Sequence, residues 1–177
     1  MVSFSQAIAN FFGKYATFSG RSTRAEYWWV QLFNLIIYVV IYGLPVCYLL
    51  ATGSSSYELL FNQPMLLSAA GVILIIYGLA ILIPGIALTV RRLHDIGRSG
   101  WWYLGFVLAI YAVYGLMFMS VFQAALGHGT RGFSGITIVA ATILMLVVMV
   151  VWLVWLCTPS APDNEYGPNP ESEEYWQ

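Results

Sequence analysis

Residues 66–102 read LLSAAGVILIIYGLAILIPGIALTVRRLHDIGRSGWW, and this stretch decides the fold class. The part up to Val90 has no formal charge and is long enough, as a helix, to cross a hydrocarbon core of about 30 Å. A helix also satisfies its own backbone hydrogen bonds, which lipid cannot do. An arginine-rich run and two tryptophans follow, as expected where a helix leaves the membrane. The stretch therefore predicts a transmembrane helix that ends at a charged interface.

Three further segments have the same apolar character. The four expected spans are residues 27–51, 66–90, 101–126 and 135–157. The chain of 177 residues is 60% hydrophobic and only 8% charged, which is too apolar for a globule in water. We therefore expect a single all-α membrane domain, a polytopic transmembrane helical bundle of four spans.

The positions of the basic residues predict how the bundle is oriented, because Lys and Arg are retained on the cytoplasmic side. The loops after the first and third spans contain one basic residue, Arg131. Six basic residues lie before the first span or in the loop run 91–99: Lys14, Arg21, Arg24, Arg91, Arg92 and Arg98. Both termini are therefore expected in the cytoplasm.

The two ends of the chain differ in pattern. Residues 1–19 predict an amphipathic interfacial helix, since Ser3 and Gln6 form a capping-box pattern and apolar side chains recur at helical spacing. This helix could lie in lipid or pack on the cytoplasmic ends of the spans. Residues 158–177 are rich in proline and acids and predict an irregular cytoplasmic tail, in which Asn164–Gly167 suits a tight turn with Tyr166 as an anchor.

Several residues within the spans bear on packing. Pro84 has no N–H for the carbonyl of Ala80, so we expect a kink and a freed carbonyl. Gln31 and Asn34 share one face of the first span with Tyr38, and both amides are expected to hydrogen-bond a neighbouring helix. The small residues Gly105 and Ala109 predict close approach of another helix.

An internal echo leaves two interpretations open. Gly-Arg-Ser followed by Trp-Trp occurs in residues 20–29 and again in residues 97–102. The echo indicates either a repeated helical hairpin or two separate uses of an Arg-plus-Trp membrane anchor.

The arginine-rich segments are the candidate functional site. Guanidinium groups bind phosphates bidentately, so the pattern favours an anionic partner, either a membrane lipid or a phosphorylated lipid carrier. The residues expected to bind the headgroup are Arg21, Arg24, Arg91, Arg92, His94, Asp95, Arg98, Trp101 and Trp102.

A structural role for the same arginines is the alternative interpretation. Arginines that flank a span fix its orientation, and nearby carboxylates could pair with them. The candidate partners are Asp95, Glu26, Asp163 and Glu165, which would hold loop, N-terminal segment and tail in one cytoplasmic cap.

Other functions receive less support from the sequence. His94 is the one candidate general base, and Asp95, its neighbour in the chain, is badly placed to orient it. The sequence contains no metal-spaced His and Cys set, nucleophile elbow or glycine-rich phosphate loop, so we predict no metal or cofactor. A membrane enzyme acting on a phospholipid or lipid carrier is the least favoured alternative.

Transport and assembly remain alternatives. No span has an ionisable group at its midplane, which disfavours coupled transport. A transporter or channel subunit, a homo-oligomer and an organiser of membrane-protein partners all stay open. The net charge of −1 gives no reason to expect a nucleic-acid partner.

The polar motifs resemble those of a known family. They are Gly20–Arg24 before an aromatic span, Arg91–Asp95 after a proline-containing span, Ser99–Trp102, and Asn164–Gly167 in the tail. In these features the chain is similar, over nearly its whole length, to the bacterial proteins of the domain of unknown function 805 family. The resemblance implies a multi-pass protein of the bacterial inner (plasma) membrane and no established activity.

Overall fold

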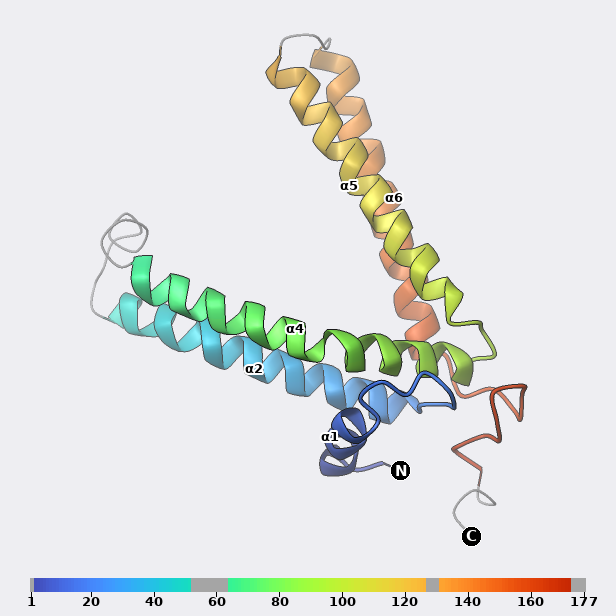
Figure 1. Ribbon diagram of the computed structural model, residues 1–177. Coiled ribbons are helices and arrows are strands. Elements are labelled where there is room, and N and C mark those ends of the chain that lie inside the picture. Colours follow the sequence, from blue (N-terminus) through green and yellow to red (C-terminus); the bar gives the residue numbers. More distant parts are fainter. Residues whose placement is uncertain (1, 52–63, 127–130, 173–177) are drawn as a thin grey trace. The chain divides into compact units, whose positions relative to one another are not determined.

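The computed structural model describes residues 2–51, 64–126 and 131–172, and within these residues the regular structure is entirely helical. The helices are α1 (Phe4–Gly13), α2 (Arg24–Ala51), α4 (Pro64–Asp95), α5 (Trp101–Ala125) and α6 (Arg131–Cys157) (Figure 1). Four of them contain segments long and apolar enough to cross a membrane: Arg24–Tyr48, Ala69–Asp95, Trp101–Gln123 and Gly135–Cys157. The predicted all-α fold with four such helices is confirmed.

The structure divides into two units, and each is described by itself. The first unit contains Met1–Phe18 and Ala25–Leu88, and the second contains Ser19–Arg24 and Thr89–Gln177. Residues 91–95, which we expected in a loop, form the last turn of α4. Residues 173–177 of the expected tail lie outside the described residues.

In the first unit α2 runs beside α4, and a polar contact joins them (Figure 1). The Tyr77 hydroxyl donates to Oδ1 of Asn34 at 2.6 Å, and the Tyr77 ring meets the ring of Tyr38 edge to face, with centroids 6.0 Å apart. Hydrogen bonds between membrane helices contribute about 0.6 kcal/mol on average. Asn34 therefore bonds a neighbouring helix, as predicted.

The helix α1 begins at the predicted capping box. The Ser3 hydroxyl accepts from the N–H of Gln6 at 3.3 Å, and Oε1 of Gln6 accepts from the N–H of Ser3 at 3.0 Å. Phe4 meets Trp29 of α2 edge to face at 5.7 Å, and Phe11 is buried. The apolar face of α1 thus packs, at least in part, on the first residues of α2.

The proline in α4 frees a backbone acceptor, and a distant side chain satisfies it. Pro84 cannot donate to the carbonyl of Ala80, and the Tyr15 hydroxyl donates to that carbonyl at 2.6 Å. The freed carbonyl was predicted from the sequence, whereas its partner was not. Since an unsatisfied carbonyl in lipid costs several kcal/mol, this bond ties the segment after α1 to α4.

In the second unit α5 and α6 pair along their lengths (Figure 1). Aromatic rings fill the end of the pair at which α5 begins and α6 ends. Phe106 stacks on Trp152 with centroids 4.1 Å apart, and Trp102 meets Trp155 edge to face at 5.2 Å. This aromatic end leads directly to the candidate site.

Replacing Tyr15 by Phe should leave the Ala80 carbonyl unsatisfied and lower the free energy of unfolding by about 1–3 kcal/mol. In a Pro84→Ala background the helix supplies its own N–H to Ala80, so the same change should cost much less. Unfolding of all four proteins in mixed micelles, followed by circular dichroism, measures the coupling. Equal costs of Tyr15→Phe in both backgrounds would contradict this assignment.

Candidate functional site

The site begins at the C-terminal end of α4. The N–H of Gly97 donates to the carbonyl of His94 at 3.0 Å, and the N–H of Arg98 donates to the carbonyl of Leu93 at 2.9 Å. These two bonds form a Schellman cap, which places a left-handed residue just past the helix. Gly97 has a φ of 72°, a conformation that glycine adopts at little cost. Arg98 therefore stands outside the helix, beyond its capped end.

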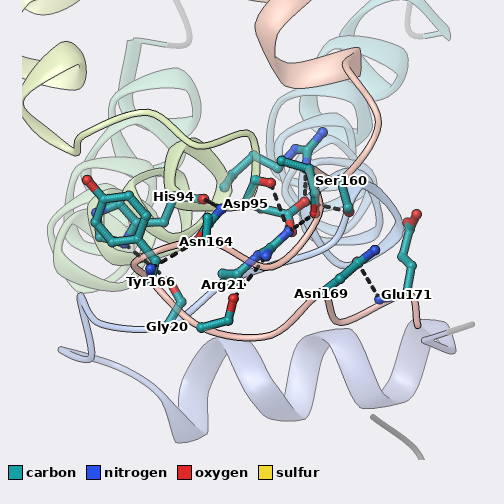
Figure 2. A network of polar contacts seen from close by, with 12 residues as sticks. Gly20, Arg21, His94, Asp95, Ser160, Asn164, Tyr166, Asn169 and Glu171 are labelled. Atoms are coloured by element: carbon teal, nitrogen blue, oxygen red, sulfur yellow. Dashed lines mark hydrogen bonds and ion pairs between the residues drawn. The ribbon is translucent and has the colours of Figure 1, made fainter. Parts of the chain in front are cut away.

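The buried carboxylate of Asp95, the last residue of α4, forms ion pairs with Arg21 and Arg92. Figure 2 shows its contacts with Arg21 and Ser160. Oδ1 of Asp95 accepts from Nε of Arg21 at 3.1 Å, while Oδ2 accepts from Nη1 of Arg92 and, at 2.7 Å, from the Ser160 hydroxyl. The side chains of Asp95 and Arg92 are 0% exposed, and that of Arg21 is 3% exposed. We call Arg21, Arg92 and Asp95 the buried charge cluster.

Arg21 uses all five N–H groups of its guanidinium inside the protein. Nε donates to the Asp95 carboxylate, and Nη2 donates to the carbonyls of Asp95 and Ala161. Nη1 donates to the carbonyls of Pro162 and Gly167, each at 3.0 Å. No donor of this guanidinium is left for a phosphate.

Arg92 caps the C-terminus of α6. Its Nε and Nη2 donate to the carbonyl of Leu156 at 3.2 and 3.1 Å, and Nη2 also donates to the carbonyl of Thr158. The last carbonyls of a helix have no partner within the helix, and its C-terminus carries about −0.5 of an elementary charge. Arg92 thus satisfies these acceptors and offsets their partial charge.

The tail folds back as a tight turn on the end of α4. Asn164 and Gly167 exchange backbone hydrogen bonds at 3.2 and 3.0 Å, and Nδ2 of Asn164 donates to the carbonyl of His94 at 3.0 Å. The ring of Tyr166 stacks on the ring of His94, with centroids 3.9 Å apart and planes 1° apart (Figure 2). A hydrogen bond to the Glu165 carboxylate raises the pKa of the Tyr166 phenol. The predicted turn and the anchoring contact of Tyr166 are confirmed.

His94 takes a backbone carbonyl, rather than a carboxylate, as its hydrogen-bond partner. Its Nδ1 lies 3.2 Å from the carbonyl of Gly20, so in the neutral ring this nitrogen carries the proton. Both oxygens of the neighbouring Asp95 accept from other groups. The two adjacent residues therefore do not form an oriented His and carboxylate pair.

Among the described residues, the ion-pair partner of Arg21 and Arg92 is Asp95 rather than Asp163 or Glu165. Asp163 instead accepts the backbone N–H of Asn169 at 2.8 Å. The tail instead reaches Arg21 through its main-chain carbonyls. The expected pairing of Asp95 with the arginines is confirmed, and main-chain hydrogen bonds hold the tail to this end of α4.

Arg98 has a different environment from Arg21 and Arg92. Its guanidinium carbon lies 3.9 Å from the ring centroid of Trp155 and 5.8 Å from that of Trp102, within the range of a cation–π contact. Within the part of the chain that the structure describes, its half-buried side chain has no carboxylate partner and no hydrogen bond. The π faces hold this cation while its N–H donors stay available.

The remaining expected residues lie around these two groups. Arg91 is 1% exposed, and its carbonyl accepts from the N–H of Ser22 at 3.1 Å. Arg24 is half-buried at the first position of α2, and Trp101 is 79% exposed at the first position of α5.

Sequence reasoning named Asp95 but missed the other partners of these side chains. Ser160 and the tail carbonyls complete the buried charge cluster, and Trp155 supports Arg98. A sequence does not show which main-chain carbonyls accept these bonds, because every residue has one. For Trp155, the available signal was its place at the end of the last span.

Replacing Asp95 by Asn keeps the shape of the side chain but leaves two buried arginines without their counter-charge. Such a loss costs about 3–5 kcal/mol, so the tail should open more than about a hundredfold more often. Cleavage at the exposed Glu165 by a protease that cuts after glutamate measures this opening. Asp163→Asn, at an exposed tail carboxylate, is the matched control and should change the rate little. Cleavage of Asp95→Asn at the unaltered rate would refute a stabilising role of the cluster.

Comparison with known proteins gives a family match. The family model described as "Protein of unknown function (DUF805)" matches residues 15–168. Inner membrane protein YhaH of Escherichia coli strain K12 is 35% identical over 94 residues, which are 53% of this chain and 66% of that protein. Inner membrane protein YhaI of the same strain is 36% identical over 92 residues, 52% of this chain and 63% of that protein. The matches therefore span a little less than two thirds of these relatives, and no solved structure matches significantly.

Proposed function

This chain belongs to the DUF805 family, whose function is unknown, and from the site we propose that it binds anionic lipid at the cytoplasmic face of the inner membrane, with Arg98 as the headgroup contact. The names of both relatives, inner membrane proteins, support this compartment. The basic residues before the first span and at the end of α4 support cytoplasmic termini.

The observation that carries the proposal is the contrast between Arg98 and the two arginines of the buried charge cluster, Arg21 and Arg92. Arg21 directs every N–H to a protein acceptor, and Arg92 is fully buried between the ends of α4 and α6. Neither can meet a headgroup unless the cluster opens. Arg98 keeps its planar fork of donors available, and that fork matches the oxygens of a phosphate.

Six of the nine expected headgroup residues fall into two sets. Arg98 and the two tryptophans that open α5 contact lipid, since indole rings suit the headgroup region. Arg21, Arg92 and Asp95 hold the tail and the helix ends together, and so position Arg98. A basic residue near an anionic surface contributes about 1 kcal/mol, which is roughly a fivefold preference for anionic lipid.

Arg98→Gln should therefore weaken retention of phosphatidylglycerol about fivefold and leave retention of phosphatidylcholine with the same acyl chains unchanged. Native mass spectrometry of the protein, released from micelles doped with either lipid, measures the retained fractions.

Two control variants distinguish binding at Arg98 from nonspecific attraction between the lipid and any positive charge of the protein. Lys14→Gln removes the same charge elsewhere and should keep the wild-type ratio of the two lipids. Arg98→Lys keeps the charge without the planar fork and should fall between wild type and Arg98→Gln. A wild-type lipid ratio in Arg98→Gln would rule out headgroup binding by this residue.

A further inference from the structure

An apolar cavity of about 280 Å³ lies between α5 and α6. Gly105 and Ala109 of α5 line it together with valines of α6, and the rings of Trp102 and Trp155 line it as well. The guanidinium of Arg98 lies over that same Trp155 ring. One fixed cation therefore stands beside an apolar cavity.

The cavity follows from small side chains at one face of α5. Gly105 and Ala109 are four residues apart and so lie on the same side of the helix. The close approach that we expected at Gly105 does not occur, because a Cβ placed there would meet no atom of the described chain within 4 Å. The space that the small residues leave is open to a ligand.

We propose that this cavity holds part of one acyl chain of a diacyl anionic phospholipid whose phosphate binds Arg98. The assignment rests on the proposed function and deepens it, because it names the lipid class. The volume is close to the lower end of small-ligand sites, about 300 Å³, and so suits part of a chain. A soluble phosphate would match the cation alone, and a neutral lipid would match the cavity alone.

The cavity and Arg98 lie at the membrane depths that the acyl chain and the phosphate of one phospholipid would occupy. All residues that line the cavity belong to Trp101–Gln123 or Gly135–Cys157, the segments apolar enough to cross a membrane. The tryptophans at the ends of these segments mark the headgroup level. Phosphate beside Arg98 and acyl chain beside Ala109 thus follow the order of groups in a phospholipid.

Packing and charge, rather than the hydrophobic effect, drive the binding of this lipid. Lipid tails are as apolar as the cavity wall, so moving a chain into the cavity gains no hydrophobic free energy. Selectivity comes from van der Waals fit in a fixed space and from a guanidinium already held on Trp155.

Filling the cavity tests the assignment. Ala109→Leu should reduce retention of long-chain phosphatidylglycerol about fivefold in native mass spectrometry, within the range of single packing contacts in membranes. Ala112→Leu adds the same side chain at an exposed position of α5 outside the cavity lining and should retain lipid as wild type does. Gly105→Leu fills the cavity from a second position and should match Ala109→Leu. Thermal unfolding by circular dichroism shows that each variant is folded.

The outcomes separate this assignment from the headgroup proposal. Wild-type retention in Ala109→Leu and Gly105→Leu, with loss in Arg98→Gln, would overturn the acyl-chain assignment and leave headgroup binding intact. No loss in Arg98→Gln would remove the headgroup proposal itself. Equal loss in Ala112→Leu and Ala109→Leu, or tighter retention of a polyprenyl phosphate than of phosphatidylglycerol, would also overturn the assignment.

Discussion

The carbonyls that end α4 and α6 must find hydrogen-bond donors, and the second unit is built around that need. Each helix end carries about −0.5 of an elementary charge, so the two ends together offset one positive charge. Arg21 and Arg92 bring two positive charges, and Asp95 balances the other. This balance explains why the charges of Arg21, Arg92 and Asp95 can be buried together, since an unbalanced buried charge costs several kcal/mol. It also explains the fold of the tail, whose carbonyls accept the remaining donors of Arg21.

The local features of the fold could be predicted from the sequence. Hydrophobic length indicates a span, and Ser3 with Gln6 indicates a helix start, because both depend on neighbouring residues alone. The end of α4 was misplaced because charge was taken as the sign of a loop. The helix in fact continues to Asp95, where Gly97 caps it. Basic side chains in a last turn are favourable, so the arginine run extends the helix.

The candidate site could be predicted only as a group of residue types. The sequence places several arginines at one end of the spans but gives no measure of which ones are buried. That division depends on contacts over more than sixty positions, such as Arg21 with Asp95 and Arg92 with Leu156. Arg98 differs because the Schellman cap carries it out of the helix and onto Trp155. The backbone turn at Gly97 thus places Arg98 where its guanidinium lies over the Trp155 ring.

A crystal structure of the protein grown in a lipidic phase containing phosphatidylglycerol tests the central claim most directly. The claim is that Arg21 and Arg92 donate their hydrogen bonds to the helix ends and the tail, while Arg98 binds the lipid phosphate. The account predicts a phosphate within about 3 Å of the Arg98 guanidinium, with a chain running between α5 and α6. A phosphate on Arg21 or Arg92, with Asp95 displaced from either, would contradict it.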